Sequence, residues 1–558
     1  MSVGLAPGGG GDVAGCSASE GEASCAGVVG TPLLAVVLAA VLAAGLIALA
    51  IRNLGYRGMW WDEASQFWVS QGVSRYSPPF AARGGLASVA RWNAWDNLDP
   101  GGFSLLLHEW TLASRGLVWL RLLPLVFFLV ASLALVVLGW RLTRSCLFAV
   151  AAGAVPSLYP SALYFALEIR AYSMEMAGIA IGALLLVLAL EWPSPRRAAL
   201  LGLACAAFLT SRYSFVLNAV ALLVALWSGS AGRVAGRTLR AQMAAAAGPI
   251  AASGAAIAGI MLRHQFWPEM HGGMLGLSSP AYTHSEVLLY APHVAALLAR
   301  DLLSPTALPV TLAIVVVLVG WGRHVAARRG YVHAAPVAGL PAARFALFAF
   351  VAVVQALSAV VSLLGLYPWD IAGRWSAYLV AVSAVAVVAL AAEVRARVLA
   401  RIAGRADAAL PRRAHVLGAA LVALVVAAAS LSAALHRQSI EGGWRTDLAL
   451  QIDRLPPGAF APGRVFVTWY EVPTLRYLYE HGPYAGRPEY PSSFRLETLA
   501  EWETEAPIAA TRDGIEFIIT ATSVGLAQAR FPGCVLRPYG GAASHLLAVQ
   551  PATPAILR

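Results

Sequence analysis

The sequence contains no lysine, so arginine supplies all 40 of its basic residues. Charged residues make up only 12% of the chain, whereas 59% of its residues are hydrophobic. With a mean hydropathy of +0.68, this balance excludes an ordinary soluble multi-domain protein and predicts a polytopic α-helical membrane protein. Abundant arginine without lysine is also typical of a GC-rich bacterial gene.

Cysteine is scarce as well, and its spacing carries no metal or disulfide signature. The five cysteines form neither a CxxC pair nor a Cys/His cluster with metal-ligand spacing, which argues against a disulfide framework and a structural zinc site. The histidines within 263–301 match no compact metal motif either. No Walker or GxGxxG motif is apparent, so we expect no cofactor, and nothing in the sequence supports a divalent metal ion. The cysteines are Cys16, Cys25, Cys146, Cys205 and Cys534.

The formal net charge of +11 marks the topology rather than a nucleic-acid partner. Apolar runs alternate with short arginine-rich loops, as expected when basic loops stay on the cytoplasmic side of a membrane. A membrane-crossing helix needs ~20 residues, and the runs then give about eleven spans. These runs lie at 33–51 and at roughly 117–140, 146–167, 172–191, 197–211, 213–229, 242–262, 302–322, 344–366, 375–395 and 414–435.

The boundary at Ser211-Arg212 decides the orientation of everything after it. Either two short helices or one broken helix fits the residues 197–229. Two helices keep all the arginine-rich loops on one side, whereas one helix would move Arg397 through Arg413 to the other side. We therefore prefer two helices, with the N-terminus in the cytoplasm.

Three regions follow from this topology. Residues 1–30 predict a disordered cytoplasmic tail, because they are rich in Gly, Ala and Ser. Residues 31–436 form the transmembrane module, with long outer loops at 53–115 and 263–301. Residues 437–558 predict a small α/β domain outside the cell (inner or plasma) membrane. Its strand-like runs are Arg464–Thr468, Ile515–Thr520 and Leu546–Val549, and its helix-compatible runs are Trp444–Leu455 and Val472–Glu480.

The acidic pair Asp62-Glu63 follows Trp60-Trp61 directly after the first span. Tryptophan favours the membrane surface, where ionised side chains are rarely placed without a reason. One interpretation is a helix cap or an ion pair with Arg57. The other is catalysis, because a carboxylate near a hydroxyl can take its proton as the oxygen attacks. Adjacent helical carboxylates point in different directions, so we expect them to divide the labour.

Three arginines run against the charge bias, since each lies at an outer helix end: Arg170, Arg212 and Arg374. A guanidinium beside an aromatic ring is suited to clamp a phosphate bidentately. The alternative for each is a snorkelling side chain that pairs with lipid phosphate or a nearby carboxylate. A second acidic cluster, with Asp96 and Asp99, ends the same outer loop, where Asn, Asp, Pro and Gly also fit an ordinary turn.

The order of these features resembles the GT-C glycosyltransferases of the protein O-mannosyltransferase and aminoarabinose transferase superfamily. The resemblance covers almost all of the chain after residue 30, including Trp444-Arg445 and the segment 464–477 in the tail. Two positions depart from the family pattern. Its usual basic or polar residue before Pro-Pro-Leu is replaced in Asp99-Pro100-Gly101-Gly102, and its Lys/His-Tyr pair reads Arg212-Tyr213. The matching motifs are Asp62-Glu63, Asp96 through Trp110, Arg121-Leu122-Leu123-Pro124 and Glu168-Ile169-Arg170-Ala171-Tyr172.

The resemblance implies transfer of a sugar from a polyprenyl-phosphate carrier on the outer face of the membrane, usually with inversion. It makes Asp62 the catalytic base, Glu63 an acceptor-positioning or supporting carboxylate, and Arg170 a ligand of the carrier phosphate. Topology adds Arg212 and Arg374 to the phosphate ligands. The supporting residues are Asp96, Asp99, Tyr172 and Tyr213. The acceptor could be a glycan, a lipid or a protein.

Two other classes of function compete with this hypothesis. A transporter or flippase of a lipid-linked or anionic substrate would place ionisable residues near mid-span. The apolar runs are interpreted as almost free of ionisable and strongly polar residues, with the neutral polar Gln355 as an exception. The second competitor is a non-catalytic envelope assembly protein whose outer tail binds partners.

Overall fold

The structure is a computed structural model that describes most of the chain between residues 30 and 262 and parts of the remainder. The predicted tail 1–30, the loop 263–301 and most of 437–558 lie almost wholly outside the described residues, as does Arg374. The described stretches are 30–54, 59–75, 77–97, 99–231, 233–262, 292, 295–296, 299, 311–315, 318, 342–363, 377–403, 409–435, 452, 465–467, 471–487, 490, 494–496, 517–520, 534–538 and 546–551.

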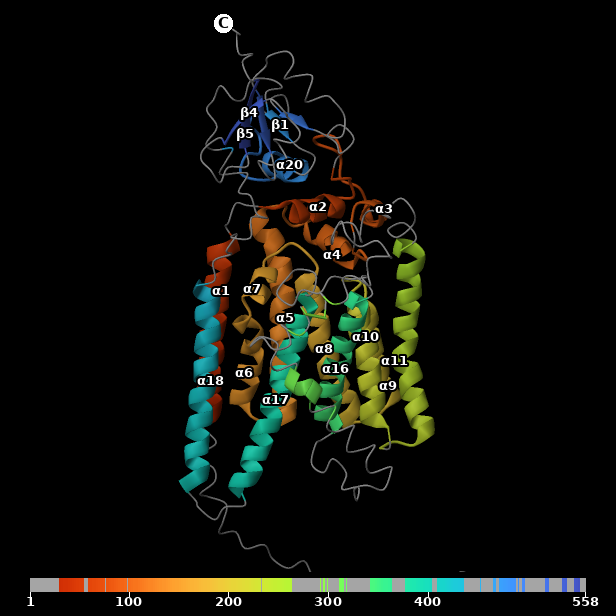
Figure 1. The fold of residues 1–558 in the computed structure, drawn as a ribbon, viewed down its shortest axis with the longest axis vertical. Coiled ribbons are helices and arrows are strands. Elements are labelled where there is room, and N and C mark those ends of the chain that lie inside the picture. The colour runs from red at the N-terminus through yellow and green to blue at the C-terminus, as the bar shows by residue number, and fades with distance from the viewer. Residues whose placement is uncertain are drawn as a thin grey trace, which may run out of the picture.

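A bundle of long apolar helices dominates the molecule (Figure 1). Within the described stretches, seven helices are long and apolar enough to cross a membrane, so the protein is a helical membrane protein. The bundle helices are α1 (Gly30–Leu54), α5 (Leu117–Thr143), α6 (Cys146–Ala154), α7 (Pro160–Phe165), α8 (Tyr172–Glu191), α9 (Pro195–Phe208), α10 (Phe215–Ser230), α11 (Gly236–Ile257), α16 (Ala342–Leu363), α17 (Ala377–Ala403) and α18 (Ala409–Leu435).

Helices α9 and α10 are separate, as the arginine pattern favours. Ser194 begins α9 by accepting a hydrogen bond from the backbone N–H of Arg197 at 3.3 Å, and Pro195 follows at the first helical position. The turn between the two helices brings Thr210 and Arg212 to the same end of the bundle as α2 (Trp61–Ser70), α3 (Leu86–Asp96) and α4 (Gly102–Trp110) (Figure 1). We call this the α2–α4 end.

Close packing of small residues joins the first and last bundle helices. A Cβ atom on Gly45 would lie 2.6 Å from the Cα of Ser430, so only glycine lets α1 approach α18 this closely. The Ser430 hydroxyl contributes a hydrogen bond to the Val41 carbonyl at 3.2 Å. Small residues at helix contacts are typical of membrane bundles.

A five-stranded sheet lies beyond the α2–α4 end, with α20 (Val472–Glu480) between the sheet and α2 (Figure 1). The strand order is β2-β1-β3-β5-β4, with β1 parallel to β2 and β3, and β5 antiparallel to β3 and β4. The sequence analysis predicts α20 with the same bounds and strands at the positions of β1, β3 and β5, but it does not predict β2 or β4. The strands are β1 (Val465–Val467), β2 (Phe494–Leu496), β3 (Phe517–Thr520), β4 (Cys534–Pro538) and β5 (Leu546–Pro551).

Two large hydrophobic clusters pack the molecule, and the smaller one holds α2 and α4 in place. The larger cluster fills the bundle from α1 to α18. The smaller one joins α2, α4, α5, the start of α8 and α20, and includes Phe67, Phe103, Leu120, Ile169 and Tyr477, each buried. The acidic pair Asp62-Glu63 is therefore carried by a helix that is packed from both sides.

Candidate functional site

Glu63 is a buried carboxylate that joins three parts of the chain. It lies in the first turn of α2, where its negative charge suits the helix N-terminus, and it accepts a hydrogen bond from the backbone N–H of Trp60 at 3.4 Å. Its other oxygen accepts from the N–H of Ile169 at 3.1 Å, and the Arg121 guanidinium on α5 lies 3.7 Å away. Both charged side chains are fully buried. These contacts fix the start of α2 against Ile169 and α5, so Glu63 is a positioning residue.

Asp62 has different charged neighbours from Glu63. It is 8% exposed, and its charge acts on Arg170. Burial alone would lower the pKa of the Arg170 guanidinium, but the carboxylates of Asp62 and Asp99, followed by Tyr172 and Glu168, outweigh it and raise that pKa. Arg170 therefore stays charged in a buried acidic environment.

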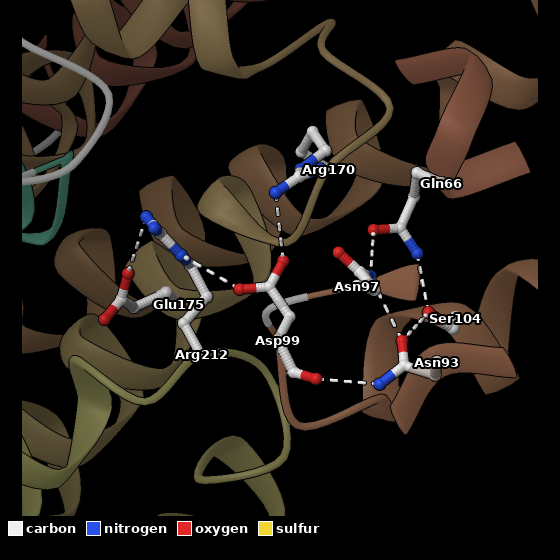
Figure 2. Close-up of polar contacts among 8 residues, drawn as sticks. All are labelled: Gln66, Asn93, Asn97, Asp99, Ser104, Arg170, Glu175 and Arg212. Atoms are coloured by element: carbon white, nitrogen blue, oxygen red, sulfur yellow. Dashed lines mark hydrogen bonds and ion pairs between the residues drawn. The ribbon is translucent and has the colours of Figure 1, made fainter. Parts of the chain in front are cut away.

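Asp99 connects the two described arginines of the predicted clamp (Figure 2). One carboxylate oxygen lies 3.3 Å from a terminal nitrogen of Arg170, and the other lies 3.6 Å from Nε of Arg212. Arg212 also pairs with Glu175 at 3.7 Å and stacks on the Tyr172 ring at 4.3 Å. The sequence analysis gives Asp99 only a supporting role, whereas the geometry makes it the central residue of the cluster.

A network of neutral side chains from α2, α3 and α4 supports Asp99 (Figure 2). Asn93 donates to the backbone carbonyl of Asp99 at 2.7 Å. Gln66 donates to Ser104 at 2.6 Å, Ser104 donates to Asn93 at 2.6 Å, and Asn97 donates to Gln66 at 3.0 Å. All four side chains are buried and hydrogen-bonded to one another, which fixes the position of the Asp99 turn.

The Pro100-Gly101-Gly102 turn has a steric requirement for its two glycines. Gly101 has a φ of 99°, a left-handed conformation that favours glycine. The N–H of Gly102 donates to the Thr210 carbonyl at 2.8 Å, and a Cβ atom on Gly102 would overlap Thr210. The second glycine thus lets the turn contact the α9–α10 connection, which brings Asp99 to Arg212.

The remaining predicted residues divide into those near the cluster and those whose side chains are not described. Tyr213 lies close enough to Asp99 for the charge of that carboxylate to act on it. Asp96 is the last residue of α3, but its side chain lies outside the described part, as does all of Arg374. Among the described residues, no group of three or more His, Cys, Asp and Glu side chains could hold a metal ion.

No protein-family model matches the chain, and no curated protein matches it at a significant level.

Several residues of the cluster are absent from the sequence-based site. Glu175 is fully buried in the first turn of α8, accepts a hydrogen bond from the Ser214 hydroxyl at 2.6 Å and pairs with Arg212. The view that the apolar runs carry almost no ionisable residue overlooks it, although a carboxylate inside an apolar run is a recognisable signal. The network of Gln66, Asn93, Asn97 and Ser104 has no comparable signal, because it depends on how three short helices meet.

The cluster holds two guanidiniums, which are groups that bind phosphate, among the carboxylates of Asp62, Asp99 and Glu175. Two guanidiniums are held in fixed positions by carboxylates, and their aromatic neighbour Tyr172 is buried. Charge-assisted hydrogen bonds from arginine to phosphate are strong and directional, particularly where water is excluded. The charge of Asp62 acts on Arg170, so this carboxylate belongs to the same electrostatic environment as the guanidiniums.

Proposed function

We propose that this protein is a membrane glycosyltransferase that transfers a sugar from a polyprenyl-phosphate donor to an acceptor hydroxyl or phosphate, with inversion. The observation that carries the proposal is that Asp99 bridges Arg170 and Arg212 at one end of a helical membrane protein. The charge of Asp62 acts on the same Arg170. A phosphate clamp beside a carboxylate is what a donor with a phosphate leaving group requires. The order of motifs, which resembles GT-C glycosyltransferases, supports the same function.

In the proposed mechanism the acceptor oxygen attacks the anomeric carbon of the sugar while Asp62 takes its proton. The bond between the anomeric carbon and the phosphate oxygen breaks, and its electron pair leaves with the polyprenyl phosphate. Arg170 and Arg212 stabilise the charge that develops on this leaving group, because their guanidiniums are already positioned. Glu63 keeps α2 in place through Arg121 and Ile169.

The finer topology belongs to the same proposal. We infer about eleven spans of ~20 residues, an N-terminus in the cytoplasm and the α2–α4 end outside. The sheet and α20 would then form an extracytoplasmic α/β domain of a protein in the cell (inner or plasma) membrane. Support comes from the opposite end of the bundle, whose described connections carry Arg144, Arg196, Arg197 and Arg233.

Comparative mass spectrometry of the cell envelope tests the activity. Cells that lack the gene, complemented with the wild-type chain or with Asp62→Asn, are compared for sugar-modified lipids, glycans and proteins. We expect a sugar modification that disappears without the gene, returns with the wild-type chain and stays absent with Asp62→Asn. Free donor should accumulate whenever the modification is lost.

Glu109→Gln is the matched control, because Glu109 is an exposed carboxylate on α4 at the same end of the molecule. It should restore the modification fully, at the same protein level in the membrane as Asp62→Asn. Full activity of Asp62→Asn would contradict the proposed function. Movement of a lipid-linked substrate across the membrane without sugar transfer would instead indicate a transporter, and an envelope defect without either change would indicate an assembly protein.

A further inference from the structure

We call the group of Asp62, Asp99, Arg170, Glu175 and Arg212 the Asp62 cluster. A second polar feature lies at the opposite end of the bundle (Figure 1). There the end of α5, the end of α8 and the start of α9 surround a pocket of about 210 Å³. The proposed sugar transfer uses none of its residues. The pocket is lined by Arg141, Leu185, Leu188, Trp192, Arg197 and Leu200.

Two arginines are held against one tryptophan in this pocket. The guanidinium carbons of Arg141 and Arg197 lie 5.0 Å and 4.8 Å from the centre of the Trp192 ring. Arg197 also donates to the Trp192 carbonyl at 3.0 Å, and Arg141 lies 3.7 Å from Glu191. Two positive charges thus face one carboxylate, and both guanidiniums are fixed by contacts that leave some of their N–H groups for a ligand.

The rest of the lining is apolar. Leu185 and Leu188 are half-buried on α8, and Leu200 is exposed on α9. Helices α5 and α8 are both candidate membrane spans, so their ends lie where lipid headgroups meet the acyl chains. A small soluble anion would gain nothing from three leucines, whereas a lipid would place its phosphate on the arginines and its glycerol and first methylenes along the leucines.

We propose that this pocket binds the phosphate headgroup of an anionic phospholipid. Charge complementarity selects the anion, and the leucine wall selects a lipid over a soluble phosphate. The inference is independent of the proposed sugar transfer, because it rests on a different end of the molecule and predicts binding of a bulk membrane lipid.

Native mass spectrometry of the full-length protein, released from nanodiscs that contain equal amounts of phosphatidylglycerol and phosphatidylcholine, tests the proposal. We expect wild-type protein to retain phosphatidylglycerol selectively. The double variant Arg141→Gln, Arg197→Gln should retain it at least about tenfold less, since it loses charge-assisted hydrogen bonds to the phosphate. Arg233→Gln, Arg237→Gln is the charge-matched control at the same end, where both side chains are exposed, and it should retain phosphatidylglycerol as the wild type does.

Leu188→Trp provides a variant that keeps both arginines but fills the pocket, and it should reduce retention to a similar extent. Equal retention by the wild type and both pocket variants would overturn the proposal, and so would an equal loss in the Arg233, Arg237 control. Displacement of the lipid by millimolar inorganic phosphate would also contradict it, because the pocket would then be a site for a soluble anion.

Discussion

At the residue scale, two neighbouring carboxylates occupy different environments. Glu63 is fully buried and paired with Arg121, whereas Asp62 acts on Arg170 beside Asp99. Successive helical residues point about 100° apart, so Glu63 faces Arg121 in the bundle and Asp62 faces the other residues of the Asp62 cluster. The difference assigns a structural role to Glu63 and leaves Asp62 as the proposed base.

Glu63→Gln should destabilise the protein. The substitution leaves the Arg121 guanidinium buried without its partner charge, and removal of one member of a buried ion pair costs about 3–5 kcal/mol. Thermal unfolding of the variant in nanodiscs should therefore begin at a clearly lower temperature than that of the wild type. Glu109→Gln, an exposed substitution on α4, should leave the transition unchanged. Equal transitions for all three proteins would show that the Glu63–Arg121 pair does not hold α2 in place.

Asp99→Asn should impair donor use by the folded protein. It removes the charge that bridges Arg170 and Arg212, so the two guanidiniums lose their common anchor. Hydrogen bonds to charged groups contribute about 1.5–3 kcal/mol, which corresponds to a loss of roughly tenfold to 100-fold in kcat/KM for the donor. Steady-state kinetics with a polyprenyl-phosphate sugar would measure this loss. Unchanged kcat/KM would exclude Asp99 from the donor site.

Much of this residue-level pattern can be predicted from the sequence, because the acidic pair, Arg170 and Arg212 stand out against an apolar chain. The central position of Asp99 cannot be predicted. It depends on the left-handed Gly101 and on the close approach of Gly102 to Thr210, two residues that are far apart in the sequence. Glu175 could have been predicted, since it is a carboxylate within an apolar run.

At the element scale, α20 contacts α2 through a dense set of aromatic and charged groups. The Trp68 indole donates to the Pro473 carbonyl at 2.8 Å, and the fully buried Arg476 stacks on Trp68 at 3.9 Å. Phe67 meets Tyr477 and His481 edge to face, with ring centres 5.0 Å and 5.4 Å apart. Since α2 carries Asp62, the segment around α20 influences where the proposed base lies.

The contact between α20 and α2 should weaken at mildly acidic pH. Burial, and in addition the charges of Arg115 and Arg476, lower the pKa of His481 from 6.5 to about 4. The folded state thus binds this proton more weakly than the unfolded chain does. The stability that neutral His481 contributes is present above pH 6.5 and is lost as the pH falls toward 4. Hydrogen exchange of the α20 amides should accelerate at pH 5 relative to pH 7.5, after correction for intrinsic exchange.

His481→Phe is the control for that measurement, because phenylalanine keeps the ring contacts with Phe67 and Trp68 but cannot bind a proton. Its α20 amides should show the same corrected exchange at both pH values. If the variant were as pH-dependent as the wild type, another group would be responsible.

The elements differ in how far the sequence predicts them. Long apolar helices such as α5 and α8, and α20 with its aromatic pattern, follow from periodicity alone. The short helices α2, α3 and α4 lie in a segment that the sequence identifies as a functional loop or a carrier of short interfacial helices. Their bounds do not follow from the sequence, because their polar faces are buried against one another. Strands β2 and β4 are too short, or too mixed in composition, to stand out.

At the scale of the whole molecule, the two ends of the bundle differ in charge and in structure. The α2–α4 end carries the Asp62 cluster and the sheet, and the opposite end carries short arginine-rich connections. The proposed positive-inside arrangement would place the Asp62 cluster outside the cytoplasm. The alternation of apolar runs and basic loops is sufficient to predict this asymmetry, whereas the packing order of the helices depends on tertiary contacts such as that of Gly45 with Ser430.

Cysteine labelling of intact cells would test the orientation. In a background in which the five native cysteines are replaced by serine, a membrane-impermeant maleimide should label Ser114→Cys, which is exposed at the α2–α4 end. Pro193→Cys, exposed at the opposite end, should be labelled only after the cells are opened. The reverse pattern would place the Asp62 cluster in the cytoplasm and would contradict an extracytoplasmic site.

The most direct test of the proposed function is donor turnover by purified protein reconstituted in vesicles. The vesicles are supplied with the lipids, glycans and proteins of the envelope of cells that lack the gene. Release of free polyprenyl phosphate from its sugar-linked form is followed by mass spectrometry. Wild-type protein and Glu109→Gln should release it at the same rate. Asp62→Asn, folded and present at the same level, should release it at least about 100-fold more slowly, because the acceptor loses its general base. Turnover by Asp62→Asn at the wild-type rate would contradict the assignment of Asp62 as the base.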